Sequence, residues 1–94
     1  MADKCKELIE KVQTLAQPGN DQAAKDGFDK LFDEYVTASK AAHTDAFAHD
    51  HVISDVQQLQ NQIRTARANS VGQEKRTFSH AEKRISTWLT SEKK

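Results

Sequence analysis

Residues 24–42 read AKDGFDKLFDEYVTASKAA, and this stretch decides the fold class. Apolar residues recur in it at steps of four, three, four, three and four, at Ala24, Phe28, Leu31, Tyr35, Ala38 and Ala42. Steps that alternate between three and four average about 3.5 residues per turn, which keeps one stripe of a helix facing a neighbouring helix. The stretch therefore predicts an amphipathic helix that packs in a bundle.

Three further segments show the same spacing. Their apolar residues are Cys5, Leu8, Val12 and Leu15 in the first, Val52, Val56, Leu59, Ile63 and Ala66 in the second, and Val71, Phe78, Ala81, Ile85 and Trp88 in the third. A chain of 94 residues is too short for a second hydrophobic core. The sequence therefore predicts one all-α domain over residues 1–94, a four-helix antiparallel bundle with a short first helix.

The helix boundaries are predicted from helix breakers and capping residues. Pro18 ends the first helix, expected over residues 3–16, because proline disfavours helical geometry at the residue before it. Asn20 is the expected N-cap of the second helix, since its side-chain oxygen can accept a hydrogen bond from a free backbone amide. Ser70 and Gln73 have the spacing of a capping box at the start of the fourth helix.

The boundary between the second and third helices is the least marked, because residues 28–71 contain no proline or glycine. One helix over residues 20–68 would be about 73 Å long, which is too long for a compact domain of this size. The two apolar stripes also fall out of phase after Ala42, so we expect a break near His43 with Thr44 as the next N-cap. The alternative is an extended helical hairpin that forms a dimer.

The formal net charge of zero hides an uneven distribution of charge. Residues 1–55 hold six lysines and eleven acidic residues, whereas residues 56–94 hold eight basic and three acidic residues, including all four arginines. Such opposed charges either pair within the bundle or across a dimer, or the basic face meets an acidic partner. We expect Arg76, His80 and Arg84, spaced four apart, to face outward, away from Phe78. The candidate partner-binding residues are Arg64, Arg67, Arg76, His80, Lys83, Arg84, Asp26, Asp29 and Asp33.

The small stock of core-forming side chains indicates that the chain gains stability by association. Leu, Ile, Val and Phe make up 18 residues, and ordering a chain of this length costs more free energy than burial of such a core supplies, so hydrogen bonding and packing must supply the difference. We therefore expect a non-enzymatic protein–protein interaction or regulatory module, whose partner is another protein or a second copy. The alternative is nucleic-acid binding through the basic face of the third and fourth helices. Against it, Phe78 and Trp88 belong to the core stripe and leave no platform on which bases stack.

A second alternative is a metal site at residues 43–51, HTDAFAHDH, where His43, His49 and His51 are candidate ligands. On a helix His49 and His51 project about 200° apart, so the three imidazoles converge only if the stretch is a loop. The simpler interpretation is a polar junction between helices whose histidines cap helix ends. We therefore expect no metal and no cofactor.

The sequence contains no signature of catalysis or of membrane insertion. It has no glycine-rich phosphate loop and no nucleophile elbow, so we expect no enzyme activity. Cys5, the single cysteine, is predicted to face the core, where a thiol behaves as a small apolar group. No 18-residue apolar run and no signal-peptide opening occur, which predicts a cytoplasmic protein without a membrane partner.

Overall fold

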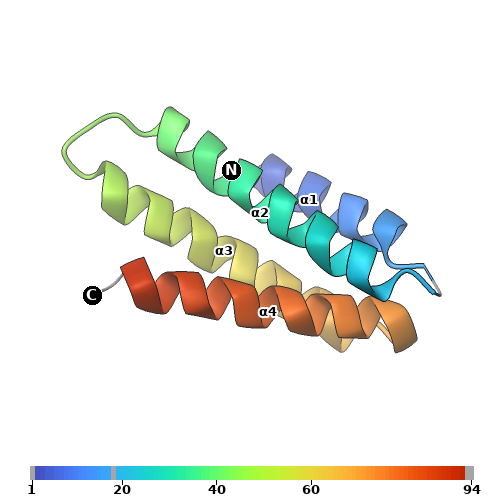
Figure 1. Cartoon of the computed structure of the whole chain (residues 1–94). Helices are drawn as coiled ribbons and strands as arrows, with labels where there is room; N and C mark the ends of the chain where they lie inside the picture. Colours follow the sequence, from blue (N-terminus) through green and yellow to red (C-terminus); the bar gives the residue numbers. More distant parts are fainter. Residues whose placement is uncertain (1, 18, 93–94) are drawn as a thin grey trace.

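The computed structural model describes residues 2–17 and 19–92, which form four helices and no strand. The helices are α1 (Ala2–Leu15), α2 (Asp21–Ala42), α3 (Ala48–Ala68) and α4 (Gly72–Glu92). Consecutive helices run in opposite directions (Figure 1). The predicted four-helix antiparallel bundle is therefore confirmed, and so is its short first helix, since α1 has 14 residues and the others have 21 or 22. The extended hairpin does not occur, because residues 43–47 separate α2 from α3.

The four helices pack as two hairpins, α1–α2 and α3–α4, in a bundle that measures 44 × 23 × 21 Å. The closest packing is between α3 and α4, and α4 also lies along α2. Helix α1 contacts α2 and α3 and touches α4 least. Helices α2 and α4 are thus neighbours that run in the same direction (Figure 1).

The predicted apolar stripes form the core, except that Ala42, near the end of α2, is exposed. The fully buried large side chains of the core include Phe28, Phe32, Phe78, Leu59, Ile63, Ile85, Val12 and Val56. Val71 does not belong to it, although its spacing from Phe78 predicts so: its side chain is 83% exposed. The reason is that Val71 precedes the first residue of α4 and lies in the turn after α3, where helical periodicity does not apply. Among the described residues the only other large hydrophobic side chain classed as exposed is Phe47, at 66%.

One predicted N-cap keeps its position and another does not. Asn20 is the N-cap residue of α2, as predicted, but its side chain does not bond to that helix: Nδ2 donates to the backbone oxygen of Leu15 at 3.1 Å and so caps the end of α1. The break at His43 is confirmed, whereas Thr44 is not the N-cap of α3, which begins only after Phe47. The longer loop is stabilised by Asp45, whose Oδ1 accepts a hydrogen bond from the backbone amide of Phe47 at 3.0 Å.

The capping box predicted for α4 is also wrong. Ser70 Oγ donates to the backbone oxygen of Ala66 at 2.6 Å, so this side chain satisfies the end of α3. Helix α4 begins two residues later at Gly72, whose φ of +61° is a backbone conformation that favours glycine. The side chain of Gln73 donates to Asp21 across the bundle instead of capping its own helix.

No helix formed by residues 2–17 and 19–92 combines the length and the apolar character that a membrane crossing requires.

Candidate functional site

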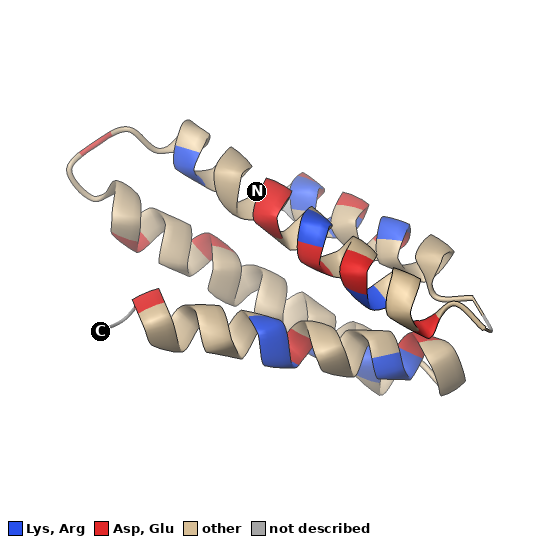
Figure 2. Ribbon diagram, in the orientation of Figure 1, with Lys and Arg blue, Asp and Glu red and all other residues tan. Residues whose placement is uncertain are grey.

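Helices α2 and α4 are joined by a series of ion pairs. His80 Nε2 lies 3.0 Å from Asp29 Oδ1, and the Arg84 guanidinium reaches Asp33 at 3.5 Å and Asp29 at 4.0 Å. Figure 2 shows the acidic positions of α2 beside the basic positions of α4. Residues four apart lie on one face of a helix, and two parallel helices keep the same register, so His80 and Arg84 each meet an acid of α2.

The same series continues at the beginning of the two helices. Arg76 Nε lies 3.5 Å from Asp21 Oδ2, and Arg76 Nη2 donates to Gln73 Oε1 at 2.6 Å. The expectation that Arg76, His80 and Arg84 face outward holds for Arg76, whose side chain is 59% exposed, and only in part for His80 and Arg84, which are about one-third exposed. They lie along α2, because α4 packs beside α2 as well as on α3.

Arg84 also covers part of the core. Its guanidinium carbon lies 5.1 Å from the centre of the Phe32 ring, a distance at which a cation is attracted to the ring face. Trp88 meets Phe32 edge-on at 6.1 Å between ring centres. The α2–α4 contact is therefore apolar inside and ionic at its surface.

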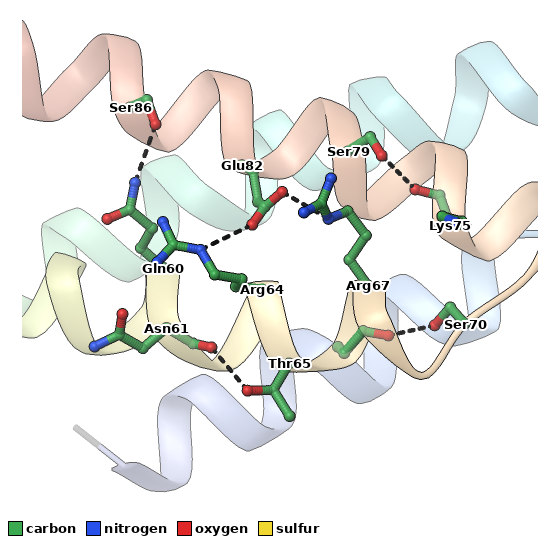
Figure 3. A network of polar contacts seen from close by, with 11 residues as sticks. Gln60, Asn61, Arg64, Thr65, Arg67, Ser70, Lys75, Ser79, Glu82 and Ser86 are labelled. Atoms are coloured by element: carbon green, nitrogen blue, oxygen red, sulfur yellow. Dashed lines mark hydrogen bonds and ion pairs between the residues drawn. The ribbon is translucent and has the colours of Figure 1, made fainter.

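The two remaining arginines are held between α3 and α4. Arg64 Nε and Arg67 Nε lie 3.4 Å and 2.8 Å from the two oxygens of Glu82, which is positioned between them (Figure 3). The Glu82 side chain is only 17% exposed. Beside it, Gln60 Nε2 donates to Ser86 Oγ at 3.0 Å. All four arginines of the chain thus have a carboxylate partner inside the molecule.

Two of the predicted partner-binding residues lie outside these networks. Asp26 is exposed on α2 and accepts a hydrogen bond from Gln22 of its own helix at 2.9 Å. Lys83 is exposed on α4 and forms no ion pair with another described residue. The predicted set therefore divides into seven residues with an ion pair within the bundle and two, Asp26 and Lys83, without one among the described residues.

Lys83 belongs to a shallow depression that we call the basic hollow. Its lining is Lys25 of α2 together with Gly72, Lys75, Arg76, Ser79, His80 and Lys83 of α4. No carboxylate lines it. Lys25, Lys75 and Lys83 form no ion pair within 4.0 Å among the residues that the structure describes. Sequence analysis did not identify Lys25, whose contribution depends on the packing of α4 beside α2.

A partly buried polar network crosses from α2 to α3 near the other end of the bundle. Asp55 Oδ2 accepts a hydrogen bond from Ser39 Oγ at 2.6 Å and lies 2.9 Å from His43 Nε2. Ser39 is fully buried. Sequence analysis missed this network, although Ser39 falls four residues after Tyr35 in an otherwise apolar stripe. The Ser39 hydroxyl and the His43 imidazole both contact the Asp55 carboxylate. In a catalytic triad the imidazole lies between the hydroxyl and the carboxylate, so this arrangement is not that of a triad.

The three candidate metal ligands do not converge. The rings of His43 and His51 stack at 4.8 Å between centres, and His51 Nε2 lies 3.7 Å from Asp45 Oδ2. His49 instead lies 3.4 Å from the backbone oxygen of Glu92 at the end of α4. Within the described part of the chain, no three His, Cys, Asp or Glu side chains are grouped as a metal would require.

Cys5 lies in the core, as predicted, and contacts the same network. Its sulfur is 3.2 Å from the hydroxyl of Tyr35, which donates to the backbone oxygen of Asp55 at 2.6 Å. Burial raises the pKa of the Cys5 thiol above its ordinary value. Burial, followed by the hydrogen bond with Cys5, also raises the pKa of Tyr35. Both groups are therefore neutral at neutral pH, and the thiol is unreactive.

No protein-family model matches this chain, and no curated protein or solved structure matches it. Its function is therefore inferred from the contacts and charges described above.

Proposed function

We propose that this protein is a non-enzymatic interaction module that binds an acidic segment of another protein at the basic hollow. The observation that supports this is that the arginines and the lysines of the basic hollow differ in whether they have a carboxylate partner. All four arginines pair with carboxylates, whereas Lys25, Lys75 and Lys83 line a depression that contains no acid. An acidic partner supplies the charges that the chain itself does not place there.

The proposed binding depends on several charges acting together. An exposed ion pair contributes under about 1 kcal/mol, so one lysine alone would not hold a partner. Clustered charges of one sign also raise the rate at which an oppositely charged partner arrives. We therefore expect a moderate affinity that decreases steeply as salt is added.

The shape of the hollow favours a narrow partner. From Gly72 to Lys83 it extends about 17 Å along α4, the length of roughly five extended residues. Carboxylates border it on both sides: Asp29 on α2 contacts His80, and Glu82 lies toward α3. A single acidic peptide segment fits between these borders, whereas a broad phosphate surface would meet the acids.

Nucleic acid is the second candidate, because the same lysines suit phosphate groups. The other residues of the predicted nucleic-acid face give less support to nucleic-acid binding. Arg64 and Arg67 are both engaged by Glu82. Phe78 is fully buried and Trp88 packs against Phe32, so these rings are not free to stack on bases.

We also propose a cytoplasmic location, since the single cysteine is a buried free thiol.

Fluorescence anisotropy with a labelled, glutamate-rich peptide tests the proposed function. We expect the wild-type protein to bind it at low ionic strength and the K75E/K83E variant to bind at least about tenfold more weakly. The matched control is K6E/K40E, which changes the net charge equally at exposed positions of α1 and α2 outside the hollow.

The proposal is wrong if the wild-type protein does not bind the peptide at low salt. It is also wrong if the control variant loses as much affinity as K75E/K83E, because binding would then follow net charge alone. Duplex DNA and single-stranded RNA are measured in parallel. If either nucleic acid binds more tightly than the peptide and is equally sensitive to K75E/K83E, the function is nucleic-acid binding and not binding of an acidic segment.

A further inference from the structure

A separate groove lies between α1 and α2. It consists of two adjoining hollows that share Lys11, Leu31 and Glu34. Its apolar lining comes from both helices: Leu8, Leu15, Gly27, Leu31 and Ala38. Leu15 and Leu31 are only partly buried, which distinguishes them from the enclosed residues of the core. We call this feature the α1–α2 groove.

The register of the two helices is fixed by contacts near its two ends. Cys5 lies beside Tyr35, with 3.2 Å between sulfur and hydroxyl. Ten residues later Leu15 lies against Gly27, where an added Cβ would be 2.6 Å from Leu15 Cδ1. The helices run in opposite directions, so residues with higher numbers on α1 lie beside residues with lower numbers on α2.

This register places like charges opposite each other across the groove. Lys11 of α1 lies level with Lys30 of α2, and Glu7 of α1 lies level with Glu34 of α2. All four side chains are exposed and line the groove. Lys4 approaches Glu7 to 3.9 Å, but both side chains of this pair are more than half exposed. The groove thus has a basic end and an acidic end, with Leu31 between them.

We propose that a second copy of this chain binds in the α1–α2 groove and forms a two-fold symmetric dimer. In such a dimer the same patch contributes twice and must complement itself. A two-fold axis across the groove reverses its direction, so that Lys30 of each copy faces Glu34 of the other and Lys11 faces Glu7. Leu31 of one copy then lies near Leu31 of the other. A two-fold axis parallel to the groove would instead keep its direction and place the basic end of one copy against the basic end of the other.

The charges favour a second copy over an unrelated partner. Lys11 and Lys30 carry equal charges at one end of the groove, and Glu7 and Glu34 carry equal charges at the other end, where the exposed Lys4 offsets Glu7 in part. Equal charges that face each other are unfavourable in the isolated molecule. The reversed copy brings two charges of the opposite sign to each end and covers the partly exposed leucines. The groove does not include the residues that line the basic hollow, so the dimer and the acidic segment are tested independently.

A charge-exchange experiment tests the dimer by sedimentation over a concentration series that reaches about 1 mM. We expect the wild-type protein to dimerise and K30E and E34K each to dimerise at least about tenfold more weakly, because two attractive contacts become repulsive in each. An equal mixture of K30E and E34K restores the dimer, since the mixed pair again places opposite charges together. K40E, on α2 outside the groove, keeps the wild-type association.

Circular dichroism confirms that each variant is folded, as expected for exposed positions. A wild-type protein that remains monomeric at the highest concentration overturns the proposal. So does a mixture of K30E and E34K that associates no better than either variant alone, or a K40E protein that is as weakened as K30E.

Discussion

The partly buried carboxylate network predicts a large loss of stability when Asp55 is replaced by alanine. In the folded protein Asp55 Oδ2 is 2.6 Å from Ser39 Oγ and 2.9 Å from His43 Nε2, and the Asp55 side chain is 16% exposed. A hydrogen bond to a charged group contributes about 1.5–3 kcal/mol, and an unsatisfied buried polar group costs about 1–3 kcal/mol. Because Ser39 is fully buried, we expect D55A to lower the free energy of unfolding by about 2–4 kcal/mol.

A double-mutant cycle separates the network from the general cost of truncation. S39A removes the hydroxyl donor but leaves Asp55 beside His43, so we expect it to cost about 1.5 kcal/mol, the lower value for a hydrogen bond to a charged group. In the S39A background no buried hydroxyl is left unpaired by D55A, and the second substitution should therefore cost at least about 1 kcal/mol less than it does alone.

Urea denaturation followed by circular dichroism measures these differences, with the slope of the transition as the control for two-state unfolding. In thermal unfolding each kcal/mol corresponds to a shift of about 4–8 °C for a domain of this size. A D55A protein that loses under about 0.5 kcal/mol, or strictly additive effects of S39A and D55A, would refute the view that this network stabilises the α2–α3 contact.

Two further predictions concern the α2–α4 contact and the buried thiol. R84A removes the ion pairs with Asp29 and Asp33 and the cation over the Phe32 ring. Because Arg84 is one-third exposed, we expect the free energy of unfolding, measured by urea denaturation, to fall by about 1 kcal/mol. We expect R84K to restore this loss only in part. The pKa of Cys5 is raised above its ordinary value of 9.0 by burial, so the unfolded chain releases this proton first and stability falls as the pH rises above about 9. C5A, followed by the same denaturation at pH 8 and pH 10, should lose less stability between these two values than the wild-type protein does; an identical pH dependence would contradict the assignment.

Much of the fold is encoded in local periodicity, which the sequence displays directly. The steps of three and four place Tyr35 and Ile63 in the core, and both are buried, whereas Ala42 at the end of its stripe is exposed. The helix ends were predicted less well because side chains such as Asn20 and Ser70 can cap either the preceding or the following helix. Both bind the preceding one, through Leu15 and Ala66, and this choice depends on the path of the turn.

The charged residues show why sites are harder to predict than cores. Helical spacing indicates that Arg76, His80 and Arg84 share a face, but not which helix that face meets. In a bundle whose sequence neighbours are antiparallel, the basic face of α4 was expected to be open to solvent. One side of this face pairs with acids of α2 while the rest stays open to solvent, and this cannot be read from spacing within one helix.

The ion pairs between α2 and α4 also explain why two parallel helices lie side by side. Parallel helices align their dipoles, which is weakly unfavourable, and no short loop connects them. The partners of Asp21, Asp29 and Asp33 lie 51 to 55 residues later in the chain, a nearly constant offset that only a parallel arrangement in register provides. The uneven charge of the two halves of the sequence therefore serves first to align these helices. The proposed binding function rests on the lysines of the basic hollow, which this alignment leaves without an ion pair among the described residues, rather than on the arginines that it engages.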